Sequence, residues 1–231
     1  MTAPHPMTID IWSDVMCPWC YVGWGNLKQA LEQLGDEVEP QIRWHAFELN
    51  PDMAPEGEDR TAHIARKYGR TLDESKAVQG RMREAADTAK VSLDYEGAGE
   101  DGADAPPAMM WNTRDAHKLL TWALEQAGPQ AQTALKLALF KAHFNARRNV
   151  SDHEVLLDVA ASVGLHREAA KAALVDSDLE ARVVAEERAA WDMNISGVPA
   201  MVLNGKFMVP GAQPPETYVN VLRRVIEKTA A

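Results

Sequence analysis

The stretch Asp10-Ile-Trp-Ser-Asp-Val-Met-Cys-Pro-Trp-Cys-Tyr-Val-Gly23 contains both cysteines of the chain and decides its fold. Its first half belongs to a segment, Thr8 to Asp14, whose β-branched and aromatic residues are typical of a strand. Directly afterwards, apolar residues recur in steps of three and four and predict a helix with one buried stripe, formed by Cys20, Trp24, Leu27, Leu31 and Leu34. Gly35 stands where that helix is expected to end. The Cys-Pro-Trp-Cys motif is therefore predicted at the junction of a strand and a helix.

A second strand and then a long helical region are predicted after this helix. Ile42 to Leu49 has the pattern of a strand, and the intervening helix is long enough to bring it back parallel to the first. Asn50 to Arg60 is rich in proline and acidic residues and is interpreted as a linker. From Thr61 to Trp191 nearly every segment has helical period. The acidic stretch Glu96 to Pro107 is interpreted as a surface loop between two of these helices.

Local signals divide the helical region into separate helices. Three pairs match the capping-box spacing at a helix start, namely Thr71 with Glu74, Ser151 with Glu154 and Ser177 with Glu180. Three glycines stand where helix ends are expected, namely Gly69, Gly128 and Gly164. Met109-Met110-Trp111 is interpreted as helix–helix core, and His45 and His117 as structural residues.

Strand patterns return only near the C-terminal end. Pro199 to Leu203 and Lys206 to Val209 are predicted strands, joined by Asn204-Gly205, a strong signal for a type I′ turn. A last helix is predicted from Pro215 to Lys228. The order is therefore β–α–β, a helical block and β–β–α. This order predicts an α/β chain in which residues 1–49 and 195–231 form one domain and residues 50–194 form an inserted helical domain.

The composition excludes several classes of protein. The chain has 231 residues, 46% of them hydrophobic and 25% charged, as expected of a globular protein. Its net charge of -10 disfavours nucleic acid as a partner. It contains no apolar run of about 18 residues, so neither a membrane span nor a membrane partner is expected. Residues 1–7 lack the basic and apolar regions of a signal peptide, and a cytoplasmic location is expected.

The two cysteines, Cys17 and Cys20, are better explained by chemistry than by structure. One pair is too few for a disulfide scaffold, and a zinc site usually needs four nitrogen or sulfur ligands. No metal and no cofactor is therefore expected. At a helix start, backbone N–H groups and the helix dipole favour the thiolate of Cys17, which would be the attacking sulfur. Cys20 begins the buried stripe and would resolve the mixed disulfide.

These segments resemble the DsbA family of the thioredoxin superfamily, and within it the FrnE-like branch. The resemblance lies in residues 10–23, in Ser196-Gly-Val-Pro-Ala-Met-Val-Leu203 with Gly211-Ala-Gln-Pro-Pro215, and in Asn112-Thr-Arg-Asp-Ala-His117. It implies a thioredoxin fold with a large all-helical insertion domain. It also implies that Val198-Pro199 is a cis peptide packed against the cysteines, with the backbone of Val198 free to pair with an extended substrate.

The expected site follows from the motif and the resemblance together. Its expected catalytic residues are Cys17, Cys20 and Pro199, and its expected substrate-binding residues are Val198, Trp19, Pro18 and Tyr21. Strong oxidants of the family carry a histidine between the cysteines, where this chain has Pro-Trp. Without that cation, a potential toward the reducing half of the superfamily's range, about −120 to about −270 mV, is expected.

The function expected from these features is that of a cytoplasmic thiol–disulfide oxidoreductase or isomerase, a monomer or weak homodimer acting on protein or small-molecule disulfides. Glutathione is among the partners considered. One alternative is a glutathione-dependent isomerase or transferase on the same scaffold. Another is a holdase chaperone that does not need its cysteines. Retention of both cysteines favours the oxidoreductase.

Overall fold

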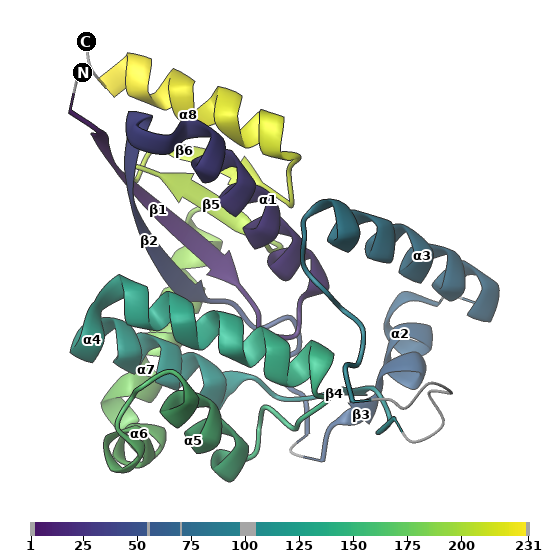
Figure 1. The fold of residues 1–231 in the computed structure, drawn as a ribbon. Helices are drawn as coiled ribbons and strands as arrows, with labels where there is room; N and C mark the ends of the chain where they lie inside the picture. The colour runs from purple at the N-terminus through teal and green to yellow at the C-terminus, as the bar shows by residue number, and fades with distance from the viewer. Residues whose placement is uncertain (1–2, 55, 70, 98–104, 230–231) are drawn as a thin grey trace.

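The computed structural model describes residues 3–54, 56–69, 71–97 and 105–229. Residues 98–104, most of the predicted acidic loop, lie outside these ranges. Its central sheet has the order β2-β1-β5-β6 (Figure 1), with β1 at His5–Ser13, β2 at Val38–Ala46, β5 at Ala200–Leu203 and β6 at Phe207–Pro210. β2 runs parallel to β1, as predicted, and β5 is antiparallel to both β1 and β6.

Helices α1 (Pro18–Leu34) and α8 (Pro215–Thr229) lie side by side against one face of this sheet (Figure 1). Alternate residues of β1, Met7, Ile9 and Ile11, point into the core that these helices cover. On the opposite face, Trp12 packs in a smaller cluster with Ala190 of α7 (Ser177–Asp192). The sheet is therefore covered on both faces, and its two central strands, β1 and β5, are the most deeply buried.

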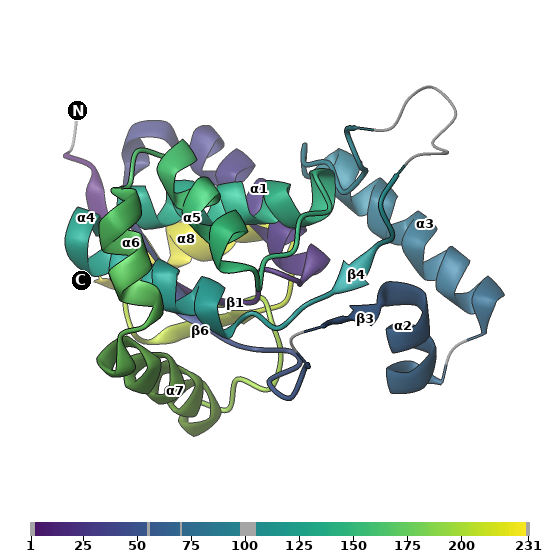
Figure 2. The same cartoon turned by 90° about the horizontal axis from the view of Figure 1, so that it is seen from below.

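The helical insertion lies between β2 and β5 and has two parts. The first consists of α2 (Arg60–Tyr68), α3 (Leu72–Thr88) and a small ribbon of β3 (Glu58–Asp59) and β4 (Met109–Met110). The second consists of α4 (Arg114–Phe140), a π-helical turn at Lys141–Asn145, α5 (His153–Ser162), α6 (Arg167–Leu174) and α7. Figure 2 shows α2, α3 and the ribbon on one side of the molecule, away from α5 to α7.

Helix α4 joins the insertion to the sheet. The fully buried side chain of Gln132 accepts a hydrogen bond from the backbone N–H of Trp44 (2.8 Å) and donates one to its carbonyl (2.7 Å). These bonds satisfy both backbone groups of Trp44 on the outer edge of β2. The indole N–H of Trp44 also donates to Thr133 at 3.0 Å. At the end of α4, Phe140 stacks on Tyr21 near the start of α1.

Of the three predicted capping boxes at helix starts, one is confirmed and two are wrong. The capping box at Thr71–Glu74 is confirmed. Those predicted at Ser151 and Ser177 are wrong, because the N-caps of α5 and α7 are Asp152 and Asp176. The aspartate carboxylates accept the free backbone N–H groups of the first turn, which moves each helix start by one residue.

Most of the predicted turns are confirmed. Gly69 and Gly164 have positive φ angles of 61° and 83° at the ends of α2 and α5. Asn204 and Gly205, at 48° and 65°, form the turn between β5 and β6. Gly128, with a φ of 82°, also ends a helical segment as predicted, since α4 consists of two helices that meet at a kink formed by Gly128 and Pro129.

Candidate active site

The two cysteines lie where β1 ends and α1 begins. Cys17 is the N-cap residue of α1, and Pro18 follows in the first turn, where a missing N–H breaks no helical hydrogen bond. Cys17 and Cys20 are 3% and 1% exposed, and both thiols are free. Cys20 belongs, with Leu27 and Leu34, to the buried stripe of α1. The motif thus connects the end of β1 to α1, and its second cysteine packs in the hydrophobic core.

The peptide bond between Val198 and Pro199 is cis, as the family resemblance predicts. The thiol of Cys17 donates to the carbonyl oxygen of Val198, with Sγ and O 3.6 Å apart. Pro199 packs against the second turn of α1, since a Cβ added at Gly23 would lie 3.1 Å from its Cγ. The structure therefore brings Cys17, Val198 and Pro199 together. Pairing of the Val198 backbone with substrate stays a prediction.

A cavity of about 360 Å³ opens beside the motif, between α1 and the helical insertion. Its wall includes Cys17 and three residues that we expect to bind substrate, Pro18, Trp19 and Val198. Trp19 is 38% exposed and available to a ligand. Tyr21 is not among the residues that line the cavity; it is buried and stacks on Phe140, with ring centroids 4.8 Å apart. The structure thus gives Tyr21 a packing position.

The far wall of the cavity comes from the first part of the insertion. Met109 and Met110, interpreted from the sequence as helix–helix core, form β4 instead, because they pair with Glu58 and Asp59 of β3. Both methionines and Trp111 are half-buried and line the cavity. Side chains of α2 and α3 complete this wall, among them Ile64, Tyr68, Val78 and Met82. The wall is mainly apolar and adaptable in shape.

The electrostatics of Cys17 differ from the expectation for an isolated helix start. Its side chain accepts no capping hydrogen bond from the first turn. The hydrogen-bonded thiol of Cys20, together with burial, raises the pKa of Cys17 well above its usual value. The expected stabilisation of a Cys17 thiolate is therefore not met in the reduced protein. The second thiol, burial and the negative charge of Asp14 all act to raise this pKa, whereas a backbone hydrogen bond to Cys20 acts to lower it.

Asp14, three residues before Cys17, is a buried carboxylate of the site. It accepts hydrogen bonds from the backbone N–H groups of Met16 (3.1 Å) and Leu49 (2.8 Å), and His117 Nε2 lies 3.9 Å away. Burial acts to raise the pKa of Asp14, but these groups outweigh it and hold the pKa below its usual value. His117 is buried, and its Nε2 has no hydrogen-bond partner among the described residues.

Lys136 of α4 is a buried cation close enough to Cys17 and Cys20 to interact with their charges. It is 0% exposed, and its Nζ donates to the carbonyl oxygen of Ser13 at 3.2 Å. The ammonium lies over the rings of Trp44 and Phe140, 5.5 and 5.0 Å from their centroids. Burial lowers the pKa of Lys136 to about 8, although the charges of Cys20, Asp14 and Cys17 act in the opposite direction. A positive charge thus faces the cysteine pair from the insertion.

Asp14 and Lys136 were missed by reasoning from the sequence. Asp14 lay inside the motif but was assigned to the end of a strand. Lys136 stands within the apolar run Leu135-Lys-Leu-Ala-Leu-Phe140, and a single lysine in such a run was a signal for a buried charge.

The described residues form neither a metal site nor a membrane span. Among residues 3–54, 56–69, 71–97 and 105–229, no three histidine, cysteine or acidic side chains are grouped so that they could hold a metal ion. Within the same ranges no helix is long and apolar enough to cross a membrane.

The strand, the Cys-Pro-Trp-Cys helix start and the cis-proline beside it define a thioredoxin-fold protein with a helical insertion. The chain belongs to the DsbA-like thioredoxin domain family, whose profile matches residues 8–223. The chain is similar to the probable DsbA oxidoreductase SCO1869 from Streptomyces coelicolor, with 28% identity and a TM-score of 0.82. That match covers 94% of this chain and 89% of the other.

Two more solved structures share the fold. A 2-hydroxychromene-2-carboxylate isomerase is 17% identical with a TM-score of 0.67, and the match covers 96% of this chain and 98% of the isomerase. DsbM, a cytosolic disulfide reductase from Pseudomonas aeruginosa, is 18% identical with a TM-score of 0.64, over 95% of this chain and 98% of DsbM. Different activities therefore occur on this scaffold, and the site residues have to decide between them.

Proposed function

We propose that this chain is a cytoplasmic thiol–disulfide oxidoreductase that reduces or isomerises protein or small-molecule disulfides through Cys17 and Cys20. The observation that carries the proposal is the pair of free thiols at the start of α1, with Cys17 on the cavity wall and Cys20 behind it in the core. A substrate in the cavity can reach Cys17, and Cys20 is placed to react with Cys17.

The proposed reaction has two exchange steps. The thiolate of Cys17 attacks one sulfur of the substrate, the substrate S–S bond breaks, and one substrate thiolate leaves. Deprotonated Cys20 then attacks the sulfur of Cys17, which closes the Cys17–Cys20 disulfide and releases the second substrate thiolate. Two electrons pass from the protein to the substrate. A thiol reductant on another molecule restores the dithiol, because the chain has no third cysteine.

The charge environment supports reduction rather than strong oxidation. A strong oxidant stabilises its reduced form through a low-pKa thiolate. Here the pKa of Cys17 is raised by Cys20 and by burial, and Pro18 and Trp19 add no cation between the cysteines. The positive charge of Lys136 acts in the opposite direction, because it favours the thiolates of Cys17 and Cys20. We therefore expect a potential closer to about −270 mV than to about −120 mV.

The proposed location and partners follow from the same chemistry. A reducing compartment suits a protein that uses both of its cysteines for exchange, and the similar DsbM is a cytosolic reductase. The proposed partners are disulfide- or thiol-containing proteins or small thiols, glutathione among them. With a net charge of -10, no nucleic-acid or membrane partner is proposed, and the chain is expected to act as a monomer or weak homodimer.

Insulin reduction and a redox titration test this function. The unaltered protein is expected to accelerate the reduction of insulin by dithiothreitol, whereas Cys17→Ser is expected to be inactive. Cys20→Ser is expected to stop after the mixed disulfide. A potential near about −120 mV would overturn the assignment as a reductase.

A glutathione-dependent isomerase is the second candidate, because the cavity beside Cys17 is of a size that takes a small molecule. The fold shared with 2-hydroxychromene-2-carboxylate isomerase is compatible with it. Glutathione-dependent turnover that survives both Cys17→Ser and Cys20→Ser would favour this candidate over the oxidoreductase.

A further inference from the structure

The cavity beside Cys17 has a positive lining in an acidic protein. Three positively charged side chains contribute to its wall, Arg60, Lys67 and Arg147. None of the described residues that line it is aspartate or glutamate. The whole chain carries a net charge of -10, so this excess of positive charge is local. A recessed wall of one sign raises the local concentration of ligands of the opposite sign.

Two of these cations bind only neutral groups in the part of the chain that the structure describes. Lys67 Nζ donates to the carbonyl oxygen of Leu49 at 2.8 Å and to the side-chain oxygen of Asn50 at 2.7 Å. Arg147 donates to the carbonyl oxygen of Pro106. Such bonds orient the cations but leave their charges uncompensated.

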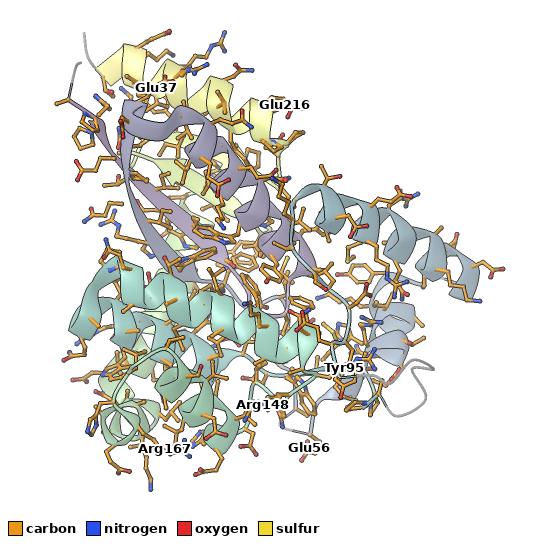
Figure 3. The ribbon with its side chains drawn as sticks, in the orientation of Figure 1. Glu37, Glu56, Tyr95, Arg148, Arg167 and Glu216 are labelled. Carbon is orange, nitrogen blue, oxygen red and sulfur yellow. The ribbon has the colours of Figure 1, made fainter. Side chains whose placement is uncertain are left out.

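Several arginines elsewhere in the insertion are paired with acids. Arg148 and Arg167, labelled in Figure 3, both bind the carboxylate of Asp158, at 2.8 and 2.6 Å. Arg167 also binds Glu154 at 2.5 Å. Arg60 differs from these two arginines, because its buried Nε has no hydrogen-bond partner among the described residues.

Of the three cations, Arg60 is the one with a buried hydrogen-bond donor that has no acceptor among the described residues. It is the first residue of α2, and its backbone N–H bonds the carbonyl oxygen of Ala108 at 2.8 Å. Its guanidinium Nε is buried and has no hydrogen-bond partner among the described residues. Burial and the neighbouring Arg147 and Arg83 lower the pKa of Arg60, and the opposing charge of Asp59 does not make up for them. A buried donor left without an acceptor is rare and unfavourable, which points to an anionic ligand.

His143 also lines this cavity and has a second buried polar atom that lacks a hydrogen bond within the described part of the chain. It lies in the π-helical turn after α4, its Nδ1 is buried, and that atom has no described hydrogen-bond partner. Burial lowers the pKa of His143 to about 4, so the ring is neutral at neutral pH. Neutral imidazole offers one donor and one acceptor to a polar group of a ligand.

We propose that the cavity binds a low-molecular-weight disulfide that carries a carboxylate, and that Arg60 holds this carboxylate while the S–S bond faces Cys17. This inference rests on the proposed function and narrows its substrate class. A volume of about 360 Å³ takes a small molecule rather than a folded chain. The methionines of β4 and Met82 provide an apolar wall for the carbon skeleton.

The reaction is the exchange already described, so its balance needs no further reagent in a single turnover. The reduced protein gives two electrons, the substrate S–S bond breaks, the Cys17–Cys20 bond forms, and two substrate thiols are released. The carboxylate takes no part in the bond changes. Arg60 therefore determines affinity and specificity and is not a catalytic residue.

A matched pair of disulfides tests the proposal. Pre-reduced protein is mixed with dithiodipropionate or with its diamide, two disulfides of almost equal size that differ in charge, and oxidation is followed through tryptophan fluorescence. We expect the dianion to react at least about ten-fold faster at low concentration, as one charge-assisted hydrogen bond allows. Arg60→Met should abolish this preference, and Arg60→Lys should restore part of it.

Arg66→Met is the matched control. It removes the same charge from the same helix, but Arg66 is exposed, binds Glu58 and does not line the cavity. The preference for the dianion should persist in this variant. Arg60→Gln, which keeps a polar side chain of similar length, replaces Arg60→Met if thermal unfolding shows that the latter is not folded.

The possible outcomes test the substrate class, the role of Arg60 and the proposed function separately. Equal rates for the two disulfides in the unaltered protein would overturn the inference and leave the proposed function intact. A preference that survives Arg60→Met would overturn the role of Arg60. If neither disulfide oxidises the cysteine pair but insulin is still reduced, the inference fails and the proposed function stands. If insulin is not reduced either, the proposed function itself fails.

Discussion

Replacing Lys136 by methionine should make the protein more stable and less reactive. Lys136 is fully buried, and burial lowers its pKa from 10.5 to about 8. One unit of pKa corresponds to about 1.4 kcal/mol, so keeping this ammonium charged in the folded protein costs about 3 kcal/mol at neutral pH. Methionine has a similar length, no charge, and packs well against the rings of Trp44 and Phe140.

The net gain is smaller than this cost, because the hydrogen bond from Lys136 to the carbonyl of Ser13 is lost as well. Such a bond contributes about 1 kcal/mol. We therefore expect a gain of about 2 kcal/mol at neutral pH, which raises Tm by roughly 4 to 8 °C in a chain of this size. The gain should shrink between about pH 8 and 10.5, since the folded unaltered protein loses the proton there while the unfolded chain keeps it.

The same substitution removes the buried positive charge that faces Cys20, Asp14 and Cys17. A nearby opposite charge lowers a thiol pKa by one unit or more, so the thiolate fraction near neutral pH should fall about ten-fold. Calorimetry measures the first effect, and the pH dependence of alkylation by iodoacetamide measures the second. A variant that loses stability and alkylates at the rate of the unaltered protein would refute the role given to Lys136.

Three further substitutions test the packing and the charge network of the protein. Gly25→Ala should destabilise the protein by about 1–3 kcal/mol, because the added Cβ would collide with the carbonyl oxygen of Ala89. Gly80→Ala, whose Cβ would meet no atom within 4 Å, should instead be neutral or stabilising, and equal Tm changes would contradict this reasoning. Burial acts to lower the pKa of His45, but two acidic partners raise it to about 9, namely Asp10 and Glu186. The stability this gives is complete below about pH 6.5 and lost as pH rises through about 9, so denaturation of His45→Asn should depend less on pH in that window.

The parts of the fold that local residues determine could be predicted from the sequence. The spacing of apolar residues after Cys20 decides the buried face of α1, and Asn204-Gly205 decides the turn of the hairpin. Both depend on residues close in the chain. The cis bond before Pro199 came from the family resemblance, since a proline alone does not determine it.

The parts that depend on distant contacts could not be predicted. Arg60 and Lys136 are 43 and 119 residues from Cys17 in the chain, by their numbers, and only the packed insertion brings them to the motif. The pKa of Cys17 was misjudged for the same reason: the helix start was visible, whereas burial was not. Met109 and Met110 were assigned to a core because their β3 partners are two residues long and acidic, a poor strand signal.

Intact-mass analysis of single-cysteine variants tests the central claim most directly, that Cys17 attacks and Cys20 resolves. Reduced Cys20→Ser and Cys17→Ser are each incubated with dithiodipropionate and with its diamide. The samples are quenched with acid, and the intact mass of each protein is measured by mass spectrometry. The account predicts a mixed disulfide on Cys17 in the Cys20→Ser variant, an unmodified Cys17→Ser variant, and an internal disulfide in the unaltered protein. A mixed disulfide that accumulates faster on Cys20 of Cys17→Ser would contradict it.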